Sequence, residues 1–205
     1  MFIRIILVLF LFEPIAFSVQ IPQDILNHRT VAVSHDHRWF AFVESLQNQK
    51  TSGFCEYVQI EERRVDRLWL YDTKTGRKRL LVAPDFSCDN PKKVIVGIDE
   101  LAFSLDDKTL YFQTTAWQTS DALHAIEVDG RNLRYLLPSK DFLVIPKGYF
   151  AGDLAIDQIR LWVPFDRGGF SWYWAFSSDG KKELGPIGPN LKPFGQENRN
   201  ADDFA

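Results

Sequence analysis

The chain has 205 residues, of which 45% are hydrophobic and 14% aromatic, so it can build one domain around a hydrophobic core. Its formal net charge of −3 gives no electrostatic basis for binding nucleic acid, and we exclude that class of partner. The 17 Phe, six Trp and six Tyr favour a β protein, because aromatic side chains suit the half-buried, pleated surface of a sheet.

Residues 1–18 have the pattern of a signal peptide. Arg4 supplies the positive start, Ile5–Phe12 is a run of eight apolar residues, and Ala16–Ser18 is a small-x-small cleavage pattern. We predict cleavage before Val19, and therefore a periplasmic or secreted protein with no transmembrane span after cleavage. The alternative is an uncleaved anchor, but eight apolar residues are fewer than the about 20 that span a bilayer.

The next segment leads into a first hairpin. Ile21–Leu26 has two open interpretations, a strand that closes the last sheet of the domain or a disordered linker. Val31–Phe42 predicts two strands around a polar turn. His35 and His37 alternate, as two metal ligands on one side of a strand would. Asp36 between them is typical of a turn that bonds to its own backbone, so we expect a turn and no metal site.

A polar insertion follows at residues 47–64. It contains a turn signal at Thr51–Gly53 and ends in the charge run Glu61–Arg64. Phe54 and Tyr57 are unusual in so polar a stretch. Because loops carry binding residues more often than core strands do, we predict that Phe54 and Tyr57 belong to a binding surface. The alternative is an ordinary solvated loop.

The chain contains two cysteines, Cys55 in the insertion and Cys88 some 33 residues later. An exported protein meets an oxidising compartment, so an even count predicts one disulfide bond, Cys55–Cys88. A disulfide bond that closes a loop of that length would stabilise the fold by roughly 3–4 kcal/mol, because it restricts the unfolded chain. The alternatives are two free thiols or a metal pair, although the spacing lacks the clustering of a zinc site.

The stretch from 101 to 137 shows the strand pattern most clearly. Short aliphatic and aromatic runs alternate with the turns Asp106–Lys108 and Asp129-Gly130, which is the hairpin signal. We predict four antiparallel strands at Leu101–Ser104, Thr109–Thr114, His124–Val128 and Leu133–Leu137.

This pattern recurs downstream. Asp157–Trp162 repeats Asp107–Phe112, and Trp174–Leu184 repeats His124–Arg134, both at an offset of 50 residues. Upstream, Val31–Phe42 repeats the first hairpin at an offset of 70 residues. Leu68–Gly76 repeats the second hairpin at an offset of 57. The unequal upstream offsets locate an insertion of some 13 residues inside the first repeat.

The third repeat is expected to start at Gly148–Gly152 and to contain the most aromatic strand, Ser171–Phe176. Trp172 and Trp174 share one face of that strand. They could stack on a sugar or a proline-containing peptide, or they could pack between sheets. We keep both as candidate binding residues, with packing favoured. The stretch Gly185–Ala205 has three Pro and no periodicity, and we predict a flexible tail at residues 188–205.

The phrases AVSHDHRWFAFVES, LAFSLDDKTLYFQT and LWLYDTKTGRKRLLV resemble the repeat elements of TolB-like, periplasmic Tol-type propellers. Similar elements occur in the propellers of prolyl-oligopeptidase-type peptidases. The resemblance covers about three repeats between residues 31 and 184. It departs from the family at the turns, where His35 and His37, and then Leu105 and Asp107, replace the family's Pro and Gly.

The resemblance and the repeats together predict an all-β fold. We expect a propeller-like array of about three four-stranded antiparallel blades over residues 19–187, either incomplete or closed by its terminal segments. Three blades are fewer than the four to eight of a closed ring, so an exposed sheet would need a cap, a distortion, or a second copy in a homodimer.

Catalytic and cofactor motifs are missing from the sequence. It has no G-x-S-x-G elbow, H-E-x-x-H, P-loop, G-x-G-x-x-G or calcium loop. We expect no catalytic residues, no metal and no cofactor, and predict a non-enzymatic module of the cell envelope that presents loops to a protein partner. The alternative is a small carbohydrate-binding protein or hydrolase that uses the Trp-rich strand.

Overall fold

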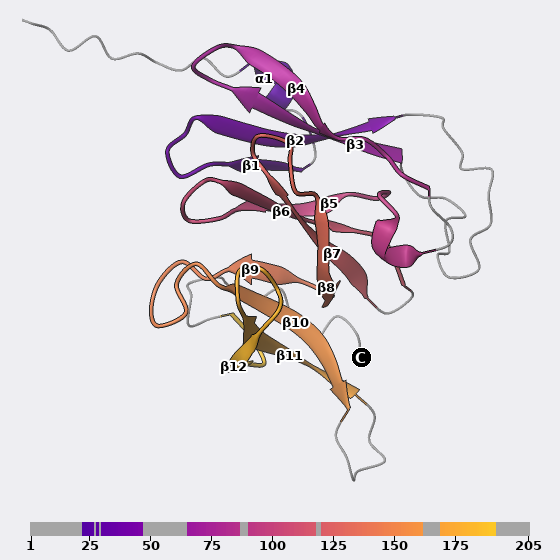
Figure 1. Ribbon diagram of the computed structural model, residues 1–205, viewed down its shortest axis with the longest axis vertical. Helices are drawn as coiled ribbons and strands as arrows, with labels where there is room; N and C mark the ends of the chain where they lie inside the picture. The colour runs from indigo at the N-terminus through magenta and orange to yellow at the C-terminus, as the bar shows by residue number, and fades with distance from the viewer. Residues whose placement is uncertain are drawn as a thin grey trace, which may run out of the picture.

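The computed structural model describes residues 22–26, 28, 30–46, 65–86, 90–117, 120–161 and 169–191. Within these residues the chain forms three four-stranded antiparallel sheets. Figure 1 shows the sheets one above another along the long axis of the molecule. The predicted all-β array of three four-stranded blades is therefore confirmed, and none of the sheets closes on itself.

The strands follow chain order, and each sheet is a simple meander. The first sheet contains β1 (Val31–Val33), β2 (Trp39–Leu46), β3 (Val65–Asp72) and β4 (Arg77–Val82). The second contains β5 (Asp99–Phe103), β6 (Thr109–Thr114), β7 (Asp121–Glu127) and β8 (Arg134–Ser139). The third contains β9 (Phe142–Val144), β10 (Leu154–Leu161), β11 (Gly169–Phe176) and β12 (Glu183–Gly188). Two short helices complete the described fold, α1 (Gln23–Leu26) and the 3-10 helix η1 (Pro91–Lys93).

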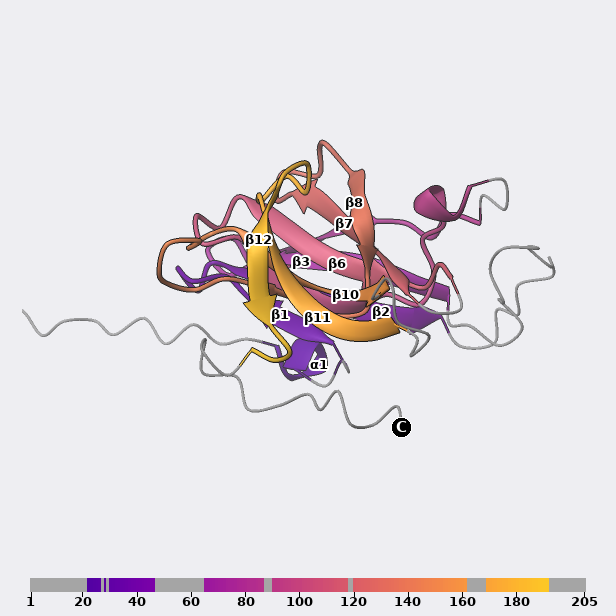
Figure 2. The same ribbon diagram turned by 90° about the horizontal axis from the view of Figure 1, so that it is seen from below.

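The sheets pack face to face, with their first strands side by side. β1 contacts β5, and β5 contacts β9. Figure 2 looks along the stack and shows the third sheet lying over the other two. Because each strand alternates its side chains between two faces, the middle sheet must be apolar on both. The strand β6 shows this directly: Leu110 and Phe112 face the first sheet, whereas Tyr111 between them faces the third.

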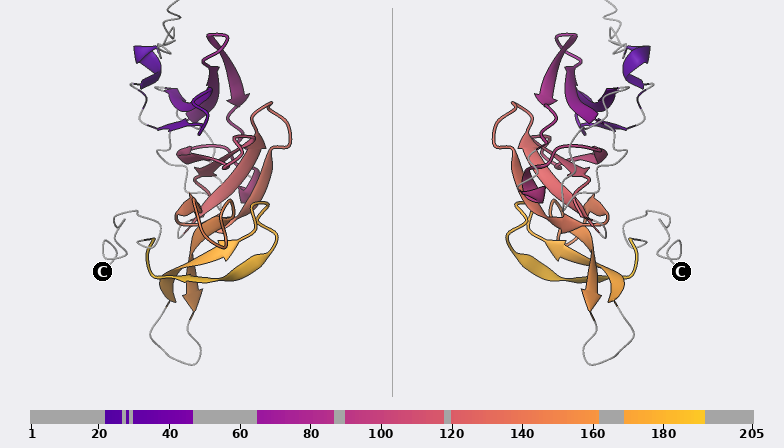
Figure 3. Two further views of the ribbon diagram at one scale, coloured as in Figure 1. Left: turned by 90° about the vertical axis from the view of Figure 1, so that its left-hand side faces the viewer. Right: turned by 90° about the vertical axis from the view of Figure 1, so that its right-hand side faces the viewer.

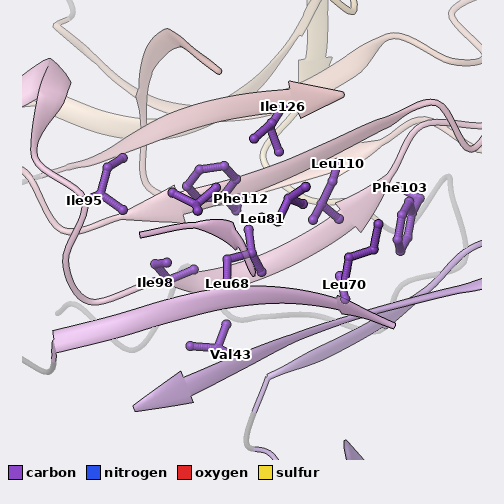
Figure 4. Close-up of a cluster of buried hydrophobic side chains, with 12 residues drawn as sticks. Val43, Leu68, Leu70, Leu81, Ile95, Ile98, Phe103, Leu110, Phe112 and Ile126 are labelled. Atoms are coloured by element: carbon purple, nitrogen blue, oxygen red, sulfur yellow. The ribbon is translucent and has the colours of Figure 1, made fainter. Parts of the chain in front are cut away.

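The largest core lies between the first and second sheets (Figure 4). Phe112, Leu68 and Leu110 are inaccessible to solvent in it. Burying such side chains contributes about 1.5–3 kcal/mol each, so this interface is a main source of stability. Its buried members are Ala41, Val43, Leu68, Leu70, Leu81, Val82, Ile95, Ile98, Phe103, Leu110, Phe112 and Ile126.

A second core joins the second and third sheets. It is built from β6, β7 and β8 on one side and from β9, β10 and β11 on the other. Tyr111 adds a polar link across this interface, because its hydroxyl donates to the carbonyl oxygen of Ser178 at 3.0 Å. The buried members of the cluster are Tyr111, Leu123, Ala125, Leu137, Phe142, Val144, Leu154, Ile156 and Phe176.

Backbone hydrogen bonds confirm the offset of 70 between the first hairpins. The Ser34 N–H donates to the Trp39 carbonyl at 2.9 Å, and the Ser104 N–H donates to the Thr109 carbonyl at 2.8 Å. The offset of 57 for the second hairpins is wrong by two residues. The bond from Thr73 N–H to Arg38 O corresponds to the bond from Val128 N–H to Lys108 O, and residues 73 and 128 are 55 apart.

The predicted offset of 50 holds for the outer turns of the second and third sheets, but not for their inner strands. The Gly130 N–H donates to Glu127 O, and the Gly180 N–H donates to Ser177 O, so the outer turns do repeat at 50. However, Asp157 is not a turn residue like Asp107, because it pairs with Tyr173 inside the β10–β11 ladder. The pairs Leu110–Ile126 and Leu154–Phe176 are equivalent, which gives an offset of 44 for the inner strands.

The start of the third sheet was also placed incorrectly. Strand β9 begins at Phe142, directly after β8, and residues 145–153 form the turn that leads to β10. Gly148–Gly152 therefore lies in that turn instead of opening a strand. Hydrogen bonds from Gly152 N–H to Ile145 O and from Ala151 N–H to Gly148 O hold the turn in shape.

Terminal segments cover the outer faces of the two end sheets. On the first sheet, Ile25 of α1 is 1% exposed and packs on Phe40, Phe42 and Tyr71. Figure 3 shows α1 beside this sheet at one end of the stack. On the third sheet, Leu191 packs with Ile145, Ala155, Tyr173 and Ala175. The chain thus shields the sheet faces that have no neighbouring sheet, at least in the part that the structure describes.

Candidate functional site

The residues predicted for binding fall in two classes. Phe54 and Tyr57, together with Cys55 and Cys88 of the predicted disulfide bond, lie outside the described residues. Their roles stay predictions. The described strands β2 and β3 end at Leu46 and begin at Val65, so they bracket the predicted insertion.

Trp172 and Trp174 lie in β11, and both are half-buried. Trp174 pairs with Ile156 and packs against the core between the second and third sheets. Trp172 pairs with Gln158. Because it is two residues from Trp174 in the same strand, its side chain lies on the same side of the sheet as that of Trp174. Trp174 therefore serves packing between sheets. Binding by either ring stays a prediction.

A different surface gathers the exposed apolar side chains. The first and last strand connections of each meander lie at one end of the sheets, which we call the turn end. Among the described residues six large hydrophobic side chains are exposed, and four of them lie at the turn end: Val33, Leu105, Leu133 and Tyr149. Tyr149 is 95% exposed and contacts Phe150 edge-on, with ring centroids 5.0 Å apart. In Figure 1 the first turns of the three sheets all project to the left. We call these turns, residues 34–38, 104–108 and 145–153, the turn row.

A carboxylate joins the first two turns of the row. Asp107 accepts the backbone N–H of His35 at 2.8 Å and that of Asp36 at 2.9 Å, one on each oxygen. The His35 ring also contacts this carboxylate, through Nδ1 at 2.8 Å. His35 therefore belongs to a turn that is hydrogen-bonded to the neighbouring sheet. This explains the departure from Gly at position 107, because glycine has no side chain to accept these bonds.

The second and third turns are also neighbours. A Cβ atom placed on Gly152 would lie 3.9 Å from Cδ1 of Leu105, so the two turns are in near contact. Phe150 packs under the third sheet with Ile145 and Leu191. Since Phe150 is anchored and Tyr149 is not, the Tyr149 ring is presented to solvent from a fixed base.

Each sheet also contains a turn that is fixed by one serine and one aspartate. The hydroxyl groups of Ser34, Ser104 and Ser177 donate to the aspartates two residues later at 2.6–2.7 Å. The same hydroxyl oxygens accept backbone N–H groups five residues on. The serine hydroxyl lowers the pKa of Asp36, Asp106 and Asp179, so these carboxylates remain charged.

Two further histidines contact aromatic rings. The half-buried His28 lies against Phe42 with the rings tilted and their centroids 4.7 Å apart. His124 is 2% exposed and lies between Phe112 and Tyr135. The Thr114 hydroxyl donates to Val94 O, so it accepts from His124 Nε2 at 3.0 Å, which fixes the proton on Nε2. Burial lowers the pKa of His124 to about 4, so this ring is neutral at pH 7.

One pair of carboxylates faces outward on the third sheet. Asp141 accepts the Tyr173 hydroxyl at 2.7 Å, and burial raises the pKa of nearby Asp157. The described residues contain no group of three or more side chains that could hold a metal ion.

Sequence reasoning missed the turn row, although one signal was present. Pro146, Gly148, Gly152 and Asp153 bracket Tyr149 within eight residues, and such clusters of turn formers predict a loop. An exposed aromatic residue inside that loop is then a candidate for binding. The contact between turns 70 residues apart could not be read from the chain.

No family model and no curated protein sequence matches the chain. Among solved structures, a protein from Bacteroides ovatus assigned as a dipeptidyl aminopeptidase IV has a TM-score of 0.51 at 12% identity, covering 74% of this chain and 23% of that one. The β-propeller domain of the Trilobed protease from Pyrococcus furiosus has a TM-score of 0.47 at 11% identity, covering 77% and 42%. TolB from Acinetobacter baumannii has a TM-score of 0.44 at 15% identity, covering 76% and 31%.

These similarities concern the fold alone, because the identities are low. The chain spans less than half the length of each of the three proteins. Together with the three stacked meanders, the similarity to the Bacteroides ovatus protein bears out propeller-type repeats as the architecture. Within the described ranges, none of the helices has the length and apolar character of a membrane span.

Proposed function

We propose that the chain is an exported, non-enzymatic binding module of the cell envelope, which holds its turns and loops out to a protein partner. The observation that carries the proposal is the turn row. Tyr149 is almost fully exposed on the third turn, Leu105 is exposed on the second, and a hydrogen bond from His35 to Asp107 joins the second turn to the first. The third turn approaches Leu105 through Gly152. Exposed aromatic and aliphatic groups on a rigid base are typical of binding hot spots, because little entropy is lost on binding.

Two further features support this proposal. Residues 1–18 have the pattern of a signal peptide, which would bring the protein to the periplasm or the exterior. The insertion at 47–64 adds Phe54 and Tyr57 as a second candidate surface.

The test is affinity capture from periplasmic extract with matched variants. Leu105→Ser with Tyr149→Ser removes the apolar groups of the turn row, and Phe54→Ser with Tyr57→Ser removes those of the insertion. Phe86→Ser is the control, since Phe86 is 41% exposed and lies outside the turn row. We expect one partner to be retained by wild type and control, and lost with the turn-row variant.

Loss only with the insertion variant would move the binding surface to residues 47–64. Retention of the partner by every variant would refute both surfaces. If no partner is recovered and the protein hydrolyses members of a substrate panel, the non-enzymatic proposal is wrong.

A carbohydrate-binding protein or hydrolase that uses the strand 171–176 is the second candidate. It is favoured by the half-exposed position of Trp172 on the same side as Trp174. A glycan array separates the two proposals. Binding that is lost in Trp172→Ala and kept in the turn-row variant would support the carbohydrate reading.

A further inference from the structure

A second surface, distinct from the turn row and rich in charged residues, runs along the outer turns of the three sheets. These turns are residues 72–79, 127–134 and 177–183, and they join the last two strands of each sheet. Their eight cationic residues, which we call the cation ridge, are Lys74, Arg77, Lys78, Arg79, Arg131, Arg134, Lys181 and Lys182.

The ridge is positive against the trend of the whole chain. The same three turns contain five carboxylates, so eight cations give the ridge a net charge of +3. The whole chain has a formal net charge of −3, which leaves −6 for the remainder. A positive surface on an acidic protein indicates selection of partners by charge.

The three turns form one continuous surface. Arg79 of the first sheet donates through Nη1 to the carbonyl oxygen of Asp129 in the second sheet at 2.7 Å. A Cβ atom on Gly180 of the third sheet would lie 3.0 Å from Cβ of Leu136 in the second. Cations that are 55 and 50 residues apart in sequence are therefore brought to adjacent turns.

The ridge carboxylates are occupied by the protein itself. Asp129 accepts the backbone N–H of Arg131 at 2.9 Å and its guanidinium group, which lowers the pKa of Asp129. Asp179 accepts the hydroxyl of Ser177 and the backbone N–H of Lys181. The ridge cations are nevertheless exposed: Arg131 and Lys181 are 79% and 83% exposed, although each forms an ion pair with its own ridge carboxylate, Asp129 and Asp179.

We infer that the cation ridge binds an acidic segment of the protein partner, and this inference rests on the proposed function. Arginine in the first two turns favours carboxylates, because the guanidinium fork can hold both carboxylate oxygens. The carboxylates interspersed along the ridge disfavour a membrane, because a uniformly anionic plane would lie against these carboxylates as well as the cations. A peptide segment can place its own carboxylates beside the cations alone. The ridge and the turn row both lie at the turn end, so a partner can use acidic and apolar groups together.

The test uses a synthetic 15-residue Glu- and Asp-rich peptide that contains one Leu and one Tyr. Its affinity for the full chain is measured by fluorescence anisotropy at low and high salt. The ridge variant is Arg77→Glu with Lys182→Glu, which changes one exposed residue of the first turn and one of the third. The control is Lys92→Glu with Lys93→Glu, which changes the net charge equally on η1, outside the ridge.

We expect binding that weakens with salt, and an affinity about tenfold lower in the ridge variant, because reversing two charges replaces attraction by repulsion. The control should bind as wild type does. Equal losses in both variants would show a net-charge effect and overturn the inference. So would stronger binding to phosphatidylglycerol vesicles than to the peptide. If the ridge variant still captures the partner that the turn-row variant loses, the proposed function stands and the ridge inference fails.

Discussion

The neutral, buried His124 predicts that the protein loses stability as the pH falls from 7 to 5. An unfolded histidine has a pKa of about 6.5, whereas burial lowers the pKa of His124 to about 4. Above pH 6.5 the ring is neutral in both states, and no penalty arises. Between pH 6.5 and 4 the unfolded state binds a proton that the folded state does not, so unfolding becomes more favourable. Below pH 4 the penalty stops growing.

The magnitude follows from these two pKa values. Each unit of pKa difference corresponds to about 1.4 kcal/mol, so the full penalty is about 3 kcal/mol. At pH 5 it reaches about 2 kcal/mol, and at pH 7 it is close to zero. The carboxylates with a lowered pKa, such as Asp36 and Asp106, lose their stabilising effect only at lower pH, near and below their ordinary value of 3.8. Asp157 acts in the opposite direction, because its raised pKa lets the folded state bind a proton more readily as the pH falls, so the comparison with a variant that lacks His124 is needed to isolate the histidine.

Urea unfolding at pH 7 and pH 5 measures this effect. His124→Phe removes the titrating group and keeps a ring between Phe112 and Tyr135, so its stability should depend much less on pH than that of wild type. His37→Asn is the control, because His37 is exposed in a turn with a φ of 55° that Asn tolerates. An unchanged pH dependence in His124→Phe would show that His124 is not the buried neutral ring described here.

Three other outcomes are expected. Gly130 has a φ of 91°, so Gly130→Val should lower the free energy of unfolding by about 1–3 kcal/mol through backbone strain. Lys74→Val, in an exposed turn, should lower it little. Equal urea midpoints for the two variants would contradict this. Asp66 is buried and accepts the Ser45 hydroxyl at 2.6 Å and the Ile98 N–H at 2.7 Å. Asp66→Ala should therefore cost about 2–5 kcal/mol, and a loss below that of Ser45→Ala would argue against the role of Asp66. Non-reducing mass spectrometry of exported protein should find a Cys55–Cys88 peptide, and free thiols at both positions would refute the bond.

The sequence was sufficient for the fold where turns are short. Val31–Phe42 and Leu101–Phe112 have the same number of residues between strands, so their alignment also aligns their hydrogen bonds. The third sheet was misaligned because its first turn is longer, at residues 145–153. A search at one constant offset then placed Asp157 in a turn, although the polar residue lies inside a strand.

The candidate surfaces were harder to predict for a different reason. The grip of Asp107 on His35 and the contact of Arg79 with Asp129 each join residues 50 or more positions apart. Such contacts depend on how sheets are stacked, which local patterns do not encode. Trp172 and Trp174 illustrate the same limit, because an aromatic strand in an outer sheet and one between two sheets have the same sequence pattern.

The stacking of sheets in chain order has a consequence for how the molecule opens. Among the described residues, the main contacts of each sheet are with the sheet next to it, so its stability is its own plus that of one or two interfaces, as in a linear array of repeats. The second sheet has an interface on both faces, whereas the end sheets have one each and a small cap. Thermal fluctuations should therefore peel the array from its ends. The amides of β6 and β7 would exchange with solvent last, and an end sheet could detach from a folded remainder, as the outermost member of a stack does.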